Sequence, residues 1–149
     1  EVNDQLKYGS LIVEMKKLQL QNEEILLLQN EQRKRVKYFQ GGNLYKLLQQ
    51  ASENDVILIT EKEWEEVWKA IDWMYPSFNK HLSDVFPGLP IQTRQLCWLT
   101  KIGIKPIGIA RILKRSRQAI SNTRTKLNGI IADSSLPDTN FDDFITNLS

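Results

Sequence analysis

The amino-acid sequence predicts an all-α protein with a long N-terminal coiled-coil helix, a helical linker region and a C-terminal domain of short helices. Residues 1–39 contain no proline and are dominated by Glu, Gln, Lys and Leu, which favour helices. Further along, apolar residues recur at helical spacing in short segments that Gly and Pro separate. The expected boundaries are residues 1–40 for the long helix, 43–88 for the linker region and 89–149 for the C-terminal domain.

The composition narrows the class of protein. Apolar residues make up 41% of the chain and charged residues 26%, as in soluble globular proteins. Cys97 and His81 are its only cysteine and histidine, so no internal disulfide forms, which fits the reducing cytoplasm. The two cannot make a typical zinc site, and no oxyanion loop or orienting partner accompanies them. We therefore expect no enzyme activity, no metal, no cofactor and no small-molecule site in this chain.

A seven-residue repeat runs through the N-terminal helix and predicts a coiled-coil seam. Leu11, Leu18 and Ile25 fall at its d positions, and Met15 and Asn22 fall at its a positions. A polar residue at an a position weakens association but can fix the register. We expect a parallel homodimer through this seam, and the alternative is a single long helix packed within a monomer.

The same helix has a second apolar stripe on another face. Its members recur every seven residues and are Leu6, Val13, Leu20 and Leu27. The helix therefore has two sides to bury, either in a dimer or against its own domain.

Local signals divide the linker region into short helices. Gly41-Gly42 ends the long helix, and Asn43 is expected to cap a helix from Leu44 to Gln50. Residues 56–59 form a short apolar run that suits an extended segment. Thr60 and Glu63 then form a Thr-x-x-Glu capping box.

Two apolar faces follow the capping box. The first is a broad stripe that we expect in the core, made of Trp64, Val67, Trp68, Ile71, Met74 and Tyr75. After Pro76, a second helix carries the apolar residues Phe78, Leu82, Val85 and Phe86. Pro87-Gly88 marks the end of the linker region.

Three short helices are predicted after Pro90. The first runs from about Ile91 to Ile102 and is closed by Gly103, and the second starts near Lys105 with a proline in its first turn. Residues 114–116 connect it to a third helix of residues 117–128, which Ser116 caps. The expected core residues are Leu96, Cys97, Leu99, Ile109, Ala110, Leu113, Ala119, Ile120, Thr123 and Leu127. Two short helices joined by a three-residue turn make a helix-turn-helix.

The charge pattern points to a function for these helices. The net charge of +2 conceals a block at residues 92–129 with nine Lys and Arg and no acid, whereas residues 130–149 hold four acids and no base. Ordinary surfaces intersperse both signs, so an acid-free basic block indicates a nucleic-acid-binding surface.

The third short helix is the expected reader of double-stranded DNA, because the second helix of a helix-turn-helix enters the major groove. Its outer face presents side chains that can bond base edges, namely Arg117, Gln118, Ser121, Asn122 and Thr125. Basic residues that flank this face are expected to meet phosphates, namely Lys105, Lys114, Arg115, Arg124 and Lys126.

Residues 89–127 resemble the LuxR/GerE-type helix-turn-helix of bacterial transcription regulators. The shared features are Leu89, Leu96, Leu99, Gly103, Ile109-Ala110, Leu113, Ser116 and Ala119-Ile120. The chain departs from the family at Thr93 and Gly108, where the family usually has Glu, and at Ser121, where it has a base-facing lysine. The aromatic segment at residues 64–87 and the closing residues 141–145 are similar to a subgroup that carries this domain after a coiled coil and an upstream repeat or membrane-anchored sensor. The resemblance implies a C-terminal fragment of a larger sensor and regulator.

Two other functions stay open. One is a module like region four of sigma factors, which would dock on RNA polymerase. The other is a coiled-coil interaction protein whose degenerate helix-turn-helix only packs. The acidic tail also has two interpretations: a small helix within Leu136–Leu148, capped near Asp138 or Thr139 and packed on the domain, or a segment that competes for the basic surface.

Overall fold

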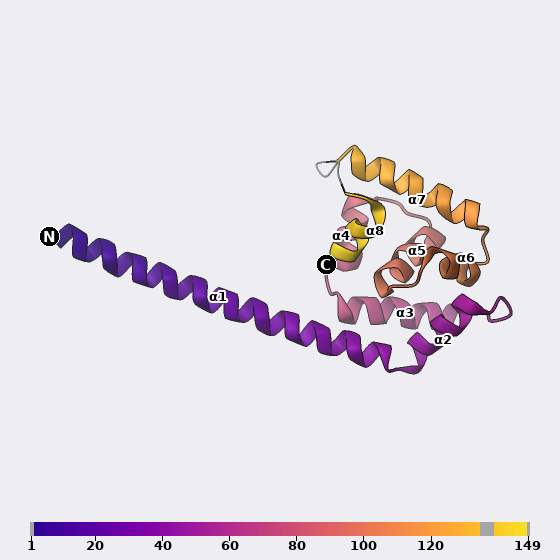
Figure 1. The fold of residues 1–149 in the computed structure, drawn as a ribbon, viewed down its shortest axis with the longest axis horizontal. Helices are drawn as coiled ribbons and strands as arrows, with labels where there is room; N and C mark the ends of the chain where they lie inside the picture. The colour runs from indigo at the N-terminus through magenta and orange to yellow at the C-terminus, as the bar shows by residue number, and fades with distance from the viewer. Residues whose placement is uncertain (1, 135–138, 149) are drawn as a thin grey trace. The chain divides into compact units, whose positions relative to one another are not determined.

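A computed structural model describes residues 2–134 and 139–148, with side chains from residue 4 onward, and the expected all-α class is confirmed for these residues. Their helices, labelled in Figure 1, are α1 (Val2–Gln40), α2 (Asn43–Glu53), α3 (Glu61–Met74), α4 (Phe78–Val85), α5 (Ile91–Ile102), α6 (Pro106–Leu113), α7 (Arg117–Ala132) and α8 (Phe141–Asn147). The chain forms two compact units, residues 1–37 and residues 38–149.

The first unit is the N-terminal part of α1, which is one uninterrupted helix as the sequence predicts. At 1.5 Å per residue, its 39 residues extend over about 58 Å. Every described side chain of residues 4–31 is exposed. The exposed side chains include both apolar stripes of this helix, with Leu18 of the seam at 58% and Leu20 of the second stripe at 60%.

The second unit begins where α1 ends, and its first helices differ in detail from the prediction. Gly42, rather than Asn43, occupies the N-cap of α2, and the helix continues three residues beyond Gln50 to Glu53. Residues 56–59 form a loop and not an extended strand, because Val56 is 88% exposed and has no neighbouring strand within the described residues. The Asn54 side chain accepts a hydrogen bond from the Val56 N–H and turns the chain there.

The capping box at the start of α3 is confirmed. The Thr60 hydroxyl accepts from the Glu63 N–H at 3.2 Å, and the Glu63 carboxylate accepts from the Thr60 N–H at 2.9 Å. The apolar stripe is only partly buried: Val67, Ile71 and Met74 are in the core, whereas Trp68 is 45% exposed. The expectation that the tryptophans of the stripe are core residues is therefore wrong for Trp68, and Trp64 is only partly buried.

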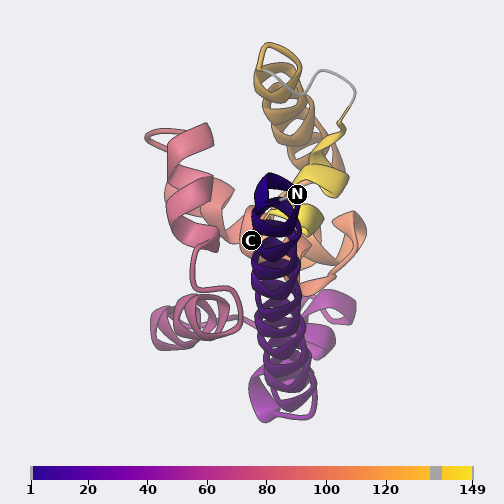
Figure 2. The same ribbon diagram turned by 90° about the vertical axis from the view of Figure 1, so that its left-hand side faces the viewer.

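The helices after α1 pack together. Residues 38–149 form one compact unit, in which α2 packs along α6. Figures 1 and 2 show α7 at one end of this body and α2 with α3 at the other end, with α5 and α6 between them.

Gly108 lets α2 approach α6 closely. A Cβ atom at this position would lie 2.8 Å from the Ser52 Cβ of α2 and 3.0 Å from the Ile104 Cγ2. Neither neighbour is the far end of a flexible side chain, so a substitution must push the two helices apart. The glycine at position 108 therefore has a structural cause, which is the helix packed over it.

We expect Gly108→Ala to destabilise the body by about 1–3 kcal/mol, the usual cost of overpacking. Gly129→Ala is the matched control, because Gly129 lies in α7 with no atom within 4 Å of its added Cβ. That control is expected to stabilise by about 0.5–1 kcal/mol, since alanine favours a helix over glycine. Urea denaturation followed by circular dichroism measures both. Equal stability of the two variants would contradict the close α2–α6 contact.

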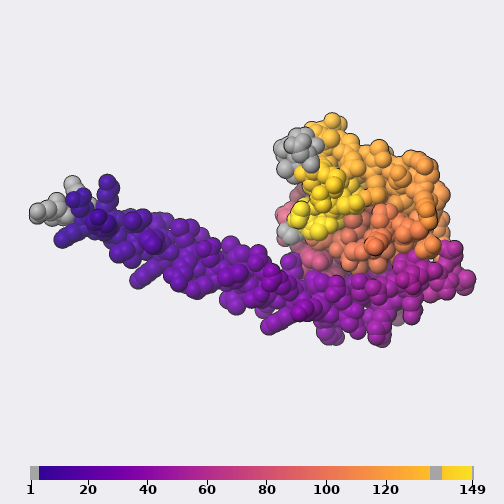
Figure 3. Space-filling model, viewed as in Figure 1, coloured from indigo at the N-terminus to yellow at the C-terminus, as the bar shows by residue number. Residues whose placement is uncertain are grey.

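The acidic tail forms a packed helix. Phe141, Phe144 and Ile145 of α8 are buried, and α8 packs against α5 and α7, which confirms the packing interpretation. Figure 3 shows the C-terminal segment, in yellow, lying against the surface of this unit. The cap is Asn140, whose side chain accepts from the Asp143 N–H at 2.8 Å, and not Thr139; Asp138 and Leu136 lie outside the described residues.

A lysine of α5 holds the end of this helix. The Lys101 ammonium donates to the carbonyls of Thr146 at 2.8 Å and Leu148 at 2.6 Å, and it lies 4.3 Å from the centre of the Tyr75 ring. Burial lowers the pKa of Lys101 to about 8, so the ammonium form still predominates at neutral pH. This charge stabilises the free carbonyls at the C-terminal end of α8.

Candidate nucleic-acid interface

The connection between α6 and α7 has the predicted length and residues. Lys114 ends α6 in a left-handed conformation, with φ 56° and ψ 41°, and the Arg115 N–H donates to the Ala110 carbonyl at 3.0 Å. Ser116 is the N-cap of α7, and its hydroxyl accepts from the Ala119 N–H at 3.0 Å. This turn fixes the direction in which α7 leaves α6, because Lys114 is left-handed, Ser116 is extended and the Arg115 N–H is bonded back to α6.

The outer face of α7 carries the five side chains that the sequence assigns to base contacts. All five are exposed: Arg117, Gln118, Ser121, Asn122 and Thr125. On the opposite side Ile120, Leu127 and Ile131 are buried, and the helix continues beyond the predicted end at Asn128 to Ala132. The face therefore points away from the core, where a ligand can reach it.

The two amides of this face are already bonded to each other. The Gln118 Nε2 donates to the Asn122 Oδ1 at 2.8 Å, one helical turn away. This leaves the Asn122 amide nitrogen as a donor and the Gln118 carbonyl as an acceptor on the same exposed surface. The pair is thus arranged as a donor and an acceptor side by side.

The start of α6 borders this face. A shallow groove of about 250 Å³ lies between Pro106 and Ile107 of α6 and Arg117, Ser121 and Arg124 of α7. The two helices therefore form one continuous surface.

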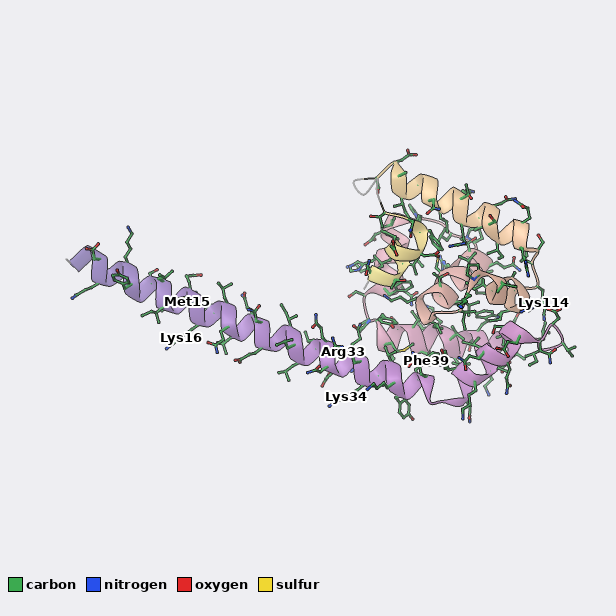
Figure 4. All side chains as sticks on the ribbon, in the orientation of Figure 1. Met15, Lys16, Arg33, Lys34, Phe39 and Lys114 are labelled. Carbon is green, nitrogen blue, oxygen red and sulfur yellow. The ribbon has the colours of Figure 1, made fainter. Side chains whose placement is uncertain are left out.

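The five side chains expected to contact phosphates differ in whether they already make contacts within the protein. Lys105, Lys126, Lys114 and Arg115 are exposed, but the last two are engaged: Lys114 donates to the Asp55 carbonyl, and Arg115 donates to the Gln92 side chain at 2.6 Å. Figure 4 labels Lys114 at the end of α6. Both contacts are exposed, so solvent and a phosphate can compete for them.

Arg124 departs most from the expectation. Its guanidinium forms an ion pair with the carboxylate of Asp142 in α8, and its Nε is buried without a hydrogen-bond partner. In this arrangement Arg124 contacts the acidic tail rather than open solvent. The sequence does not reveal the pair, because the two residues lie 18 positions apart on different helices.

Tertiary packing also adds groups to the basic surface that sequence reasoning left out. A polar groove of about 650 Å³ between α2 and the start of α6 is lined by Lys46 and Arg111 together with Lys105. Arg111 donates to the Ser52 carbonyl at 3.1 Å and lies 3.9 Å from the Asp55 carboxylate. Arg111 lies in the acid-free block, so the sequence could have identified it as part of the basic surface. Lys46 joins this surface only because α2 packs on α6.

Two other kinds of group are candidates for functional residues, namely the Cys97 thiol and side chains that could bind a metal. Cys97 is fully buried in α5, and desolvation raises the pKa of its thiol to about 12, so the thiolate is scarce at neutral pH. Over the described residues, no three His, Cys, Asp or Glu side chains gather as a metal site would require. None of the described helices is both long and apolar enough to cross a membrane.

Comparison of the chain with protein-family models, with curated proteins and with solved structures finds no match.

Proposed function

We propose that this chain is a DNA-binding transcription regulator in which α6 and α7 form a helix-turn-helix and α7 reads the major groove. The observation that carries the proposal is the outer face of α7, which is exposed, rich in hydrogen-bonding side chains and without a carboxylate of its own. An α-helix with its side chains is about 10–12 Å wide, and the major groove is about 12 Å wide.

The two kinds of contact have different roles. Asn122 and Gln118 would bond base edges, as would the shorter Ser121 and Thr125, and an amide suits adenine. Lys105 and Lys126 would contact phosphates, which position the protein without reading sequence. The regulator would act in the bacterial cytoplasm as part of a larger protein of the LuxR/GerE type.

The salt dependence of binding tests this proposal. If each protomer neutralises about four to six phosphates, affinity should fall by about 0.9 log units per phosphate for each log unit of salt. Fluorescence anisotropy with a duplex between 50 and 300 mM salt measures this slope. A chain that does not bind duplex DNA at low salt would fit the interaction-protein alternative instead, and co-purification with RNA polymerase would favour the sigma-like module.

Release of Arg124 from the acidic tail should strengthen binding to DNA. Asp142→Ala removes the carboxylate that Arg124 contacts, so this arginine becomes available to a phosphate. We expect tighter binding to all sequences and a salt slope that is steeper by about one contact, as measured by the same anisotropy titration.

Asp143→Ala is the matched control for Asp142→Ala. It removes the same charge from the neighbouring exposed position of the first turn of α8, without an ion pair to Arg124. If both variants change affinity equally, only the net charge matters, and Arg124 does not become a phosphate contact.

A further inference from the structure

The second apolar stripe of α1 lies on the opposite side of the helix from the coiled-coil seam. At about 100° per residue, Leu20 is about 160° around the helix from both Leu18 and Asn22 of the seam. A dimer through the seam therefore leaves this stripe in water. Its members are between 52% and 68% exposed, namely Leu6, Val13, Leu20 and Leu27.

The charges around the centre of this stripe change sign along the helix, from positive before Leu20 to negative after it. Lys16 and Lys17 precede Leu20 by four and three residues, and Glu23 and Glu24 follow it by three and four. These spacings place one lysine and one glutamate on each flank of the stripe, because residues three and four apart are neighbours on a helix surface. Figure 4 labels Lys16 beside Met15 of the seam.

This pattern is complementary to itself only when the second helix runs in the opposite direction. In an antiparallel pair centred on Leu20, Lys16 faces the partner's Glu23 and Lys17 faces the partner's Glu24, and the twofold axis repeats both contacts. Val13 then lies beside the partner's Leu27. In a parallel pair each lysine would lie beside a lysine and each glutamate beside a glutamate, which opposes association.

We propose that the stripe Leu6, Val13, Leu20 and Leu27 binds a second copy of this chain in an antiparallel arrangement centred on Leu20. Burial of the apolar side chains supplies the driving force, since each exposed leucine gains about 1.5–3 kcal/mol when it is fully buried. The exposed ion pairs add little energy but select the direction and register. Together with the seam, this surface would join seam dimers into larger assemblies, because each seam dimer exposes two such stripes on its outer sides. The inference does not depend on DNA binding.

Sedimentation equilibrium of the full chain tests the surface. Leu20→Asp should reduce the wild-type assembly to the mass of the seam dimer, whereas Gln21→Asp, an exposed neighbour outside both stripes, should leave the mass unchanged. Equal mass of Leu20→Asp and the wild type would overturn the proposal. Circular dichroism verifies that α1 remains helical in each variant.

Charge exchange tests the direction even if Leu20→Asp perturbs the helix. The variant K16E/K17E should lose this association, and the fourfold variant K16E/K17E/E23K/E24K should regain it, because the reversed charges are again complementary in an antiparallel pair. A parallel pair would be as repulsive in the fourfold variant as in the wild type. Failure of the fourfold variant to recover the wild-type mass would contradict the antiparallel assignment.

Disulfide crosslinking gives an independent measure of orientation. Chains carrying Val13→Cys and chains carrying Leu27→Cys should crosslink to each other when mixed under oxidising conditions, while the buried Cys97 remains protected. Crosslinking of Val13→Cys chains only with themselves would show a parallel pair and overturn the proposal.

Discussion

Asn122→Ala is expected to reduce the preference of the chain for its specific DNA site by about 1–3 kcal/mol, or about 5- to 150-fold. Asn122 is exposed at the centre of the outer face of α7, and its amide is held in place by Gln118 at 2.8 Å. Loss of the amide removes a contact that distinguishes bases, but it removes no positive charge. Binding to non-specific DNA and its salt slope should therefore stay nearly unchanged.

The measurement needs a site selected from random duplexes, followed by competition between that site and unrelated DNA. Lys126→Ala is the matched variant, because Lys126 is an exposed cation on the same helix. It should weaken binding to every sequence and lower the salt slope by about one, without a change in preference. If Asn122→Ala weakens all sequences equally, α7 does not read the bases. Alanine favours helices, so neither variant is expected to unfold α7.

Lys126 is a better choice for this comparison than Lys114. Lys114 has a left-handed backbone and donates to the Asp55 carbonyl, so its replacement changes the turn as well as the charge. A change in the turn would alter the direction of α7 and affect specific and non-specific binding together.

Leu18→Asp is expected to lower the apparent affinity for a two-half-site DNA by about 10²- to 10⁴-fold. Leu18 lies at the centre of the seam and is 58% exposed in the single chain, so a partner helix can bury it. A linked second protomer raises the effective concentration of the second contact, and an aspartate in the seam removes that link. The mass of the assembly in sedimentation should also fall.

Leu58→Asp serves as the control for Leu18→Asp. It makes the same chemical change at a loop position that is 68% exposed and outside α1. We expect this control to keep the wild-type mass and to lose only the small affinity caused by one added negative charge. Full-affinity binding by Leu18→Asp to a two-half-site DNA would mean that the seam does not couple two protomers.

The local features of this fold follow from the sequence alone. The bounds of α5, the capping box of Thr60 and Glu63, the left-handed Gly103 and the cap at Ser116 all match the prediction. These features depend on residues within one or two helical turns, so spacing and residue type suffice to locate them. The same periodicity separates the buried from the exposed side of α7, and thus locates the candidate base-contacting face.

The basic block at residues 92–129, by contrast, is acid-free only along the chain. In the folded protein, acidic residues from other segments lie beside several of its basic side chains. The Asp55 carboxylate lies near Arg111 and the Asp55 backbone carbonyl accepts from Lys114, while the Asp142 carboxylate pairs with Arg124 from α8. Each contact joins residues 18 or more positions apart, and it forms only when two separate helices dock. The sequence pattern counts charges along the chain, whereas a phosphate meets the charges that remain unpaired in space.

The sequence by itself determined where most of the helices lie, the caps at Thr60 and Ser116, and the buried side of α7. The tertiary structure decided that α2 packs on α6 over Gly108, that Trp68 stays exposed, and that Arg124 is paired with the tail. The physical reason is that periodicity specifies which face of a helix is apolar, but not which other helix packs against that face. That choice depends on shape: a Cβ at position 108 would lie 2.8 Å from the Ser52 Cβ, so only glycine allows the two helices to pack this closely.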